Sequence, residues 1–152
     1  MGIKRGKDRG MSSRINVTRR EFQDSYRRHY KMYKQTTGSE KSRRLLLFYS
    51  VECGLKSLLM KDLGKDTYED FVECCGSEKK ELTGHNVRAM LKKLNPHSSY
   101  CLKKIPLKRG GYASPDKFNE LWRYGAALAD GDEEEKAEKV LVKIAEWIHT
   151  KL

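Results

Sequence analysis

The segment LLLFYSVECGLKSLLM, residues 45–60, restricts the fold more than any other part of the chain. Its apolar residues wrap much of the circumference of a helix, which is typical of the central helix of a bundle. Glu52 and Lys56 interrupt it four residues apart, so a helix places both charges on one side. Because a lone buried charge is costly, we interpret Glu52 and Lys56 as an internal, structural ion pair. The alternative is that they border a cleft that also holds Arg123.

The N-terminal part of the chain predicts a second amphipathic helix. Thr18 and Glu21 have the spacing of a capping box, which marks the start of a helix. Four aromatic residues then recur at helical spacing: Phe22, Tyr26, Tyr30 and Tyr33. Beside an apolar neighbouring helix we expect these rings in the core. The alternative is that they stack on nucleic-acid bases, as rings do in single-strand binders.

Weaker patterns predict the remaining elements. We expect a short helix at residues 67–75, another that ends before Asn95-Pro96, and a third that starts at Ser114-Pro115 and includes Leu128. The sequence GDEEE starts the last helix, where its acids match the helix dipole. Residues 97–113 look irregular and carry no β-hairpin signal. The chain is therefore predicted to be all-α, a bundle of about five helices with four substantial ones.

The net charge of +11 is concentrated in the N-terminal third of the chain. Residues 1–44 contain 14 Lys and Arg against 4 Asp and Glu, whereas residues 45–152 contain 18 against 17. We interpret residues 1–13 as a disordered basic arm and residues 14–152 as a single helical bundle domain. This asymmetry favours a polyanionic partner, most often nucleic acid. The alternative is a tail that only increases solubility.

Two groups of basic residues are the predicted nucleic-acid contacts. Seven lie in or just before the first helix: Arg14, Arg19, Arg20, Arg27, Arg28, Lys31 and Lys34. Four lie in a glycine-containing loop and could extend the same track: Lys103, Lys104, Lys108 and Arg109. Phosphate contacts make affinity fall steeply with salt through counterion release. Deletion of residues 1–14 is therefore expected to weaken binding several-fold.

The cysteines do not have the spacing of a metal site. Cys53, Cys74, Cys75 and Cys101 form no C-x-x-C pair. We expect no metal and no cofactor, and a reducing cytoplasm is the simplest setting. No apolar run approaches the roughly 18–20 residues of a membrane span, and no secretory signal pattern is present, so we expect no membrane partner.

Three short motifs resemble those of the HEPN domain family and occur in the family's order. Residues 49–59 (YSVECGLKSLL) resemble the second-helix signature of that family. Residues 84–87 (GHNV) resemble the start of its next helix, and Arg123-Tyr124 is similar to the RYP that precedes its last helix. The resemblance covers roughly residues 40–152. It implies a four-helix bundle, frequent homodimers, and roles in RNA cleavage, toxin–antitoxin pairs or defence against phage.

HEPN ribonucleases carry an Arg-x4–6-His motif, in which histidine moves a proton and arginine stabilises charge on the phosphate. This sequence lacks the motif, since Arg123 is followed seven residues later by Asp130. An aspartate cannot do the same work near pH 7 unless its pKa is strongly raised. The departure counts against catalysis, but Arg123 with a histidine distant in sequence stays a candidate. We interpret His85 as a capping or packing histidine and place His29 at the surface.

The sequence leaves three functional hypotheses open. The first is a HEPN-like protein that binds nucleic acid, RNA rather than DNA, or a nucleoprotein, in a prokaryotic or phage-associated defence, counter-defence or toxin–antitoxin setting. The second is a divergent metal-independent ribonuclease that uses Arg123 in the cleft of a homodimer. The third is a non-catalytic interaction module that docks an acidic protein partner. Salt-dependent RNA binding separates the first two from the third, and RNA cleavage separates the second from the first.

Overall fold

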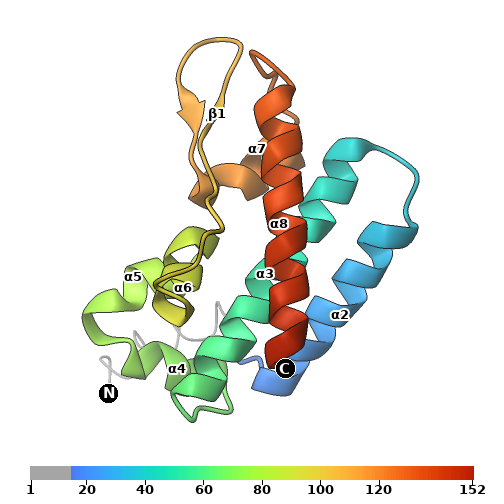
Figure 1. Ribbon diagram of the computed structural model, residues 1–152. Helices are drawn as coiled ribbons and strands as arrows, with labels where there is room; N and C mark the ends of the chain where they lie inside the picture. The colour runs from blue at the N-terminus through green and yellow to red at the C-terminus, as the bar shows by residue number, and fades with distance from the viewer. Residues whose placement is uncertain (1–14) are drawn as a thin grey trace, which may run out of the picture.

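The computed structural model describes residues 15–152, and this part of the chain is mostly helical (Figure 1). Its three long helices are α2 (Arg19–Gln35), α3 (Glu40–Asp62) and α8 (Asp132–Lys151). The shorter elements between α3 and α8 are α4 (Tyr68–Cys74), η1 (Gly76–Glu78), α5 (Lys79–Leu82), α6 (Val87–Leu94), β1 (Ile105–Pro106), β2 (Tyr112–Ala113), η2 (Pro115–Lys117) and α7 (Phe118–Tyr124). The predicted arm at residues 1–13 and Arg14 lie outside the described residues. The prediction of a mainly α-helical chain is confirmed.

The capping box at the start of α2 is present. The Thr18 hydroxyl accepts a hydrogen bond from the backbone N–H of Glu21 at 3.1 Å, and the Glu21 carboxylate accepts one from the backbone N–H of Thr18 at 2.9 Å. Two backbone donors that have no partner inside the helix are satisfied in this way. The first residues of α2 are therefore fixed, and the direction in which its basic side chains project is fixed with them.

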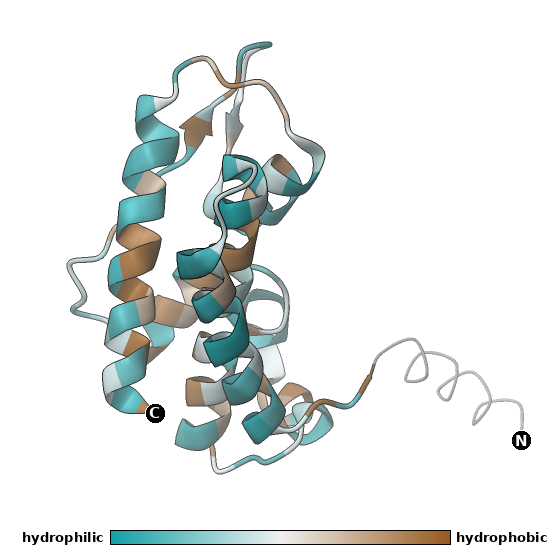
Figure 2. Ribbon diagram, turned by 90° about the vertical axis from the view of Figure 1, so that its right-hand side faces the viewer, coloured by the Kyte–Doolittle hydropathy of each residue, from teal (hydrophilic) through white to brown (hydrophobic). Residues whose placement is uncertain are grey.

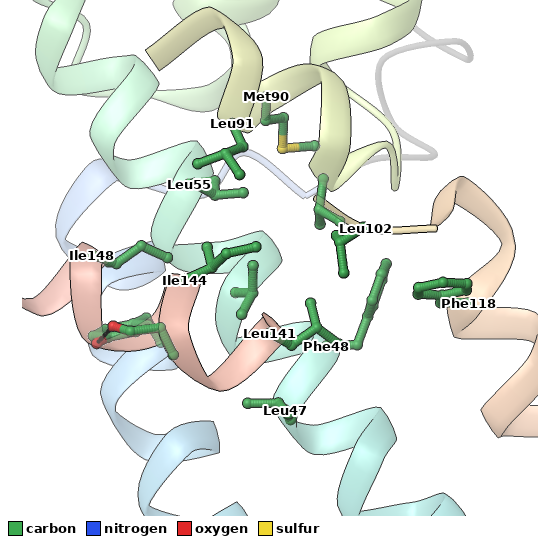
Figure 3. Packing of buried hydrophobic residues seen from close by; sticks show 14 of the residues in the cluster. Leu47, Phe48, Leu55, Met90, Leu91, Leu102, Phe118, Leu141, Ile144 and Ile148 are labelled. Atoms are coloured by element: carbon green, nitrogen blue, oxygen red, sulfur yellow. Dashed lines mark hydrogen bonds between the residues drawn. The ribbon is translucent and has the colours of Figure 1, made fainter. Parts of the chain in front are cut away.

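Helix α3 is the central element of the bundle, packed against α2, α6, α7 and α8. Figure 3 shows its apolar side chains, with Phe48 and Leu55 among them, facing the side chains of α8 and α6. Gly54 allows the closest approach, because a Cβ atom there would lie 2.9 Å from side-chain atoms of both Tyr26 and Ile148. The long apolar run thus forms a helix that its neighbours cover on several sides.

Two expectations for the second half of the chain are wrong. Strand β1 pairs antiparallel with β2 inside the stretch expected to be irregular. The reversal depends on Gly110 (φ 100°) and Gly111 (φ 76°), in a backbone region that residues with a Cβ rarely adopt. In addition, α7 ends before Gly125 (φ 67°), so Leu128 lies outside it and instead forms an isolated β-bridge with Leu107.

The helix lengths also differ from the expectation of four substantial helices. Residues 15–152 contain seven α-helices, of which α2, α3 and α8 have 17, 23 and 20 residues and the others four to eight. Of the shorter elements, α6 and α7 pack against α3 and β1 packs against α8, whereas α4 contacts α2 through the edge-to-face pair of Tyr68 and Phe22. Over these residues, no helix combines the length and the apolar character that crossing a membrane requires.

Candidate nucleic-acid interface

Four exposed cations form a row along one flank of α2, which we call the α2 basic row: Arg20, Arg27, Lys31 and Lys34. At 3.6 residues per turn they lie within about 60° of arc, and at 1.5 Å per residue they span about 21 Å. Among the described residues, only Arg27 of the four has an acidic oxygen within 4 Å, that of Asp24 at 3.9 Å. In Figure 2, which views the molecule from the side on which α2 lies in Figure 1, most of the α2 ribbon is hydrophilic. The row therefore presents nearly uncompensated positive charge.

The α2 basic row borders a shallow hollow of about 390 Å³ between α2 and α8, which we call the α2–α8 hollow. It is lined by three cations of the row and by four further residues: Arg27, Lys31, Lys34, Tyr26, Tyr30, Glu146 and His149. The two helices are joined at this point by the Tyr26 hydroxyl, which donates to the backbone carbonyl of Ala145 at 2.6 Å. Burial raises the pKa of Tyr26 to about 12, so this hydroxyl keeps its proton as a donor near pH 7.

The aromatic rings of α2 pack on one another rather than presenting free faces. The Tyr30 ring lies nearly parallel to those of Tyr26 and Tyr33, with centroids 6.2 and 6.1 Å away. Tyr26 and Tyr33 are buried, and the Lys34 ammonium lies 4.8 Å from the centroid of the Tyr30 ring. Phe22 meets Tyr68 edge to face. These rings form part of the core, so α2 offers cations for phosphate groups but no open platform for bases.

The structure does not bring all the predicted α2 cations together. Arg19 is partly covered and directs its Nε atom toward the Asp66 carboxylate at 3.8 Å. Arg28 lies about 80° around the helix from Arg20 and donates to the Ser25 hydroxyl at 3.2 Å. Arg14 falls outside the described residues. Of the seven predicted cations, four thus lie together in the α2 basic row.

The second predicted cluster forms a separate basic patch around the β1–β2 hairpin. All four of its side chains are exposed: Lys103, Lys104, Lys108 and Arg109. The Lys104 ammonium lies 4.2 Å from the centroid of the exposed Tyr112 ring, a cation–π contact. Figures 1 and 2 both show the hairpin at the top of the molecule, beyond the upper end of α2. The two groups of cations therefore come from separate elements.

Glu52 and Lys56 lie on the buried side of α3 and are joined there by a third residue. The Lys56 ammonium donates to Glu52 Oε2 at 2.9 Å, and Nδ1 of His85 lies 2.9 Å from Glu52 Oε1. Glu52 and Lys56 are 8% and 6% exposed, whereas the His85 side chain is 48% exposed. The helix that follows His85 is capped by Asn86, whose side chain accepts from Ala89 N. His85 is thus a partner of the ion pair and not a helix cap.

The surroundings of Glu52 decide its charge. Burial raises the pKa of this carboxyl, but the hydrogen bond from His85 and the charge and hydrogen bond of Lys56 together outweigh burial, and the pKa of Glu52 lies below its ordinary value. Both carboxylate oxygens have a partner. The group is therefore ionised near pH 7, and its charge is satisfied within the protein.

Arg123 lies at the surface, where it contacts a tyrosine of α3 that also packs against a histidine of α2. Its guanidinium Nη2 donates to the Tyr49 hydroxyl of α3. The Tyr49 ring lies 6.2 Å, centroid to centroid, from the ring of His29 on α2. Burial and the neighbouring Arg28 lower the pKa of His29, so its imidazole is neutral near pH 7. Tyr49 thus contacts both an exposed arginine and a neutral histidine that lie far apart in sequence.

A second buried network, which the sequence analysis missed, fixes α8 against α3. Arg44 donates to Glu134 at 2.5 Å and to Glu138 at 2.7 Å, and Trp122 donates to the other Glu134 oxygen at 2.7 Å. The Tyr33 hydroxyl donates to Glu138. One clue was available in the sequence, since Arg44 directly precedes the long apolar run, and a charge that is buried with such a run requires an acidic partner.

The described residues contain no group of three or more His, Cys, Asp or Glu side chains placed to hold a metal ion. Burial raises the pKa of the Cys53 thiol, next to Glu52, to about 12, so this thiol stays protonated near pH 7 and is a poor nucleophile. All four cysteines are free thiols.

Comparison with known proteins adds no relative. No protein-family model, curated protein or solved structure matches the chain.

Proposed function

We propose that the chain is a HEPN-like helical protein that binds RNA, or a nucleoprotein containing it, through phosphate contacts with the α2 basic row. The observation that carries the proposal is the row itself, four exposed cations along about 21 Å of one helix. The row begins next to a fixed helix cap, so the cations project from a preorganised element. Since the neighbouring rings are packed in the core, binding is to phosphate and is tolerant of sequence.

The positions of the three HEPN-like motifs support the family part of the proposal. Glu52 and Lys56 lie on the central helix α3, residues 84–86 lead directly into α6, and Arg123 lies near the end of α7, before α8. These helices all pack against α3. The resemblance also implies that the protein forms a homodimer and acts in prokaryotic or phage-associated defence, counter-defence or toxin–antitoxin systems.

The binding experiment compares two variants, each of which replaces three cations by glutamine. The first, Arg27→Gln/Lys31→Gln/Lys34→Gln, removes three cations of the α2 basic row, and the second, Lys103→Gln/Lys104→Gln/Lys108→Gln, removes three from the hairpin patch. Fluorescence anisotropy with a short labelled RNA measures affinity near 0.1 M salt. We expect the α2 variant to lose at least about tenfold in affinity and the hairpin variant to lose much less.

Polyglutamate, an acidic peptide added as competitor at the same charge concentration as the RNA, tests whether the partner is instead an acidic protein. If the α2 basic row serves an acidic protein, polyglutamate displaces the RNA at equal charge concentration, and the RNA-binding proposal fails. If it serves nucleic acid, polyglutamate competes poorly. Equal affinity of both charge variants for RNA would also contradict the proposal.

The contact of Arg123 with Tyr49 favours a second function, metal-independent ribonuclease activity. A neutral His29 can accept the proton of a ribose 2′-hydroxyl as its oxygen bonds to the adjacent phosphorus and the bond to the 5′-oxygen breaks, with the leaving oxygen taking a proton from water. The Arg123 guanidinium can stabilise the charge that develops on the phosphate. Among the described histidines, His29 is the one whose ring packs against Tyr49. This candidate uses the same surface residue that the resemblance singles out.

The nuclease test incubates the protein with tRNA and total RNA in the presence of a metal chelator. Activity is expected to disappear in Arg123→Ala and in His29→Ala and to persist in Arg88→Ala, which removes an exposed arginine of α6. Absence of cleavage by the wild-type protein, or equal cleavage by all variants, would reject the ribonuclease and leave RNA binding as the function.

A further inference from the structure

One acidic residue stands in the α2–α8 hollow among the cations that we assign to phosphate. Glu146 of α8 lines the hollow together with Arg27, Lys31 and Lys34. Its side chain is exposed, and among the described residues it forms no hydrogen bond or ion pair within 4 Å. A carboxylate there repels a phosphate, so its presence beside a phosphate-binding row requires a reason.

A carboxylate can favour RNA binding if it accepts a hydrogen bond from the sugar. An ionised carboxylate is an acceptor only, and the ribose 2′-hydroxyl is a donor that DNA lacks. We propose that Glu146 makes the α2–α8 hollow select RNA over DNA, with the cations of α2 holding the phosphate while the carboxylate accepts the ribose 2′-hydroxyl. This inference rests on the proposed RNA-binding function and names its specificity-determining residue.

The dimensions and lining of the hollow fit one sugar–phosphate unit. Its volume of about 390 Å³ is enough for a small ligand. The Tyr30 ring lines it but stacks between the rings of Tyr26 and Tyr33, so the base has no free ring to stack on. The base therefore points away from the hollow, and the site reads the sugar and the phosphate without reading sequence.

The charge of Glu146 acts on Tyr30, which also lines the hollow. Burial raises the pKa of Tyr30, and the nearby negative charge of Glu146 raises it further. Glu146 and Tyr30 come from the two different walls, α8 and α2. Because Glu146 lines the same hollow as Arg27, Lys31 and Lys34, its carboxylate and these cations can act on the same bound unit.

The test compares three single-stranded probes that share one base: oligouridylate, its 2′-deoxy form and its 2′-O-methyl form. The 2′-O-methyl sugar keeps the RNA-like pucker but has no hydroxyl to donate, so it separates sugar shape from the hydrogen bond. We expect the wild-type protein to bind oligouridylate about tenfold more tightly than either modified probe, since a hydrogen bond to a charged group contributes about this factor.

Three variants of α8 complete the experiment. Glu146→Ala is expected to bind all three probes equally, with improved affinity for the 2′-deoxy form because the repulsion is gone. Glu146→Gln keeps an acceptor oxygen and is expected to retain part of the preference. Glu135→Ala removes the same charge from the same helix, but outside the hollow, and is expected to leave the preference unchanged.

The outcomes separate this inference from the proposal on which it rests. If the wild-type protein binds the three probes equally, or if Glu146→Ala keeps the preference for oligouridylate, the role of Glu146 is rejected while RNA binding stands. If the wild-type protein binds none of the probes, the proposed function fails and this inference fails with it.

Discussion

The side chain of His85, in the loop before α6, lies 2.9 Å from the buried carboxylate of Glu52 in the middle of α3. The two residues are 33 positions apart. Lys56 neutralises the carboxylate and binds one of its oxygens, and the half-exposed His85 binds the other. The contact ties the α5–α6 segment to the central helix, and it gives the two HEPN-like motifs that contain these residues a shared structural role in this chain.

Removal of Lys56 alone is expected to cost more than removal of both charges. Lys56→Met leaves the buried Glu52 without its cation, and the free energy of unfolding should fall by about 3 kcal/mol. In Glu52→Gln/Lys56→Met no buried charge remains, so the loss should be smaller. Urea unfolding at pH 7 measures both. Equal losses would mean that water solvates both side chains.

The pH dependence of stability should report Glu52. Because its pKa is lower in the folded state than in the unfolded state, its contribution is fully present above the unfolded pKa, about 4.3, and is lost as the pH falls through the folded pKa. The stability difference between wild type and Glu52→Gln should therefore shrink as the pH falls below about 4.3. Urea unfolding between neutral and acidic pH measures this difference, and a constant difference would show that Glu52 does not titrate at a lowered pKa.

The Arg44 network predicts two further losses of stability. Arg44→Met leaves the carboxylates of Glu134 and Glu138 without their cation, and the free energy of unfolding should fall by about 3 kcal/mol. Trp122→Phe removes one donor to Glu134 and should cost about 1–3 kcal/mol. Thermal or urea unfolding measures both. The exposed control Lys139→Met should change stability by no more than about 0.5 kcal/mol, and an equally small effect of Arg44→Met would contradict the burial of this network.

Gly54→Ala tests the close approach of three helices. The added methyl group would lie 2.9 Å from atoms of Tyr26 and Ile148, so we expect a loss of about 1–3 kcal/mol although alanine favours a helix. Gly38→Ala is the matched control, since a Cβ there meets nothing within 4 Å. A Gly54→Ala variant as stable as the wild type would show that the neighbouring side chains can move aside at little cost.

The sequence predicts most reliably where local chemistry decides the structure. The capping box of Thr18 and Glu21 and the helix that contains Glu52 and Lys56 depend on spacing alone, and both features are present. The aromatic stripe was expected in the core, where Tyr26 and Tyr33 lie. Periodicity identifies the face of each helix because that face must be buried.

Features that depend on contacts distant in sequence were missed. The contact of His85 with Glu52 and the acids that pair with Arg44 join segments more than thirty residues apart, and no local pattern selects such partners. The hairpin was missed because its strands have two residues each and follow no alternation, although Gly110-Gly111 is a turn signal. The placement of the hairpin patch relative to the α2 basic row depends likewise on tertiary packing.

The salt dependence of RNA affinity tests the central claim most directly. Each phosphate contact with a single strand contributes about −0.7 to the slope of log affinity against log salt. The account predicts that Arg27→Gln/Lys31→Gln/Lys34→Gln makes the slope shallower by about 2 between roughly 50 and 200 mM salt, while the hairpin variant changes it far less. A slope that is the same for the wild type and the α2 variant would contradict phosphate binding by the α2 basic row.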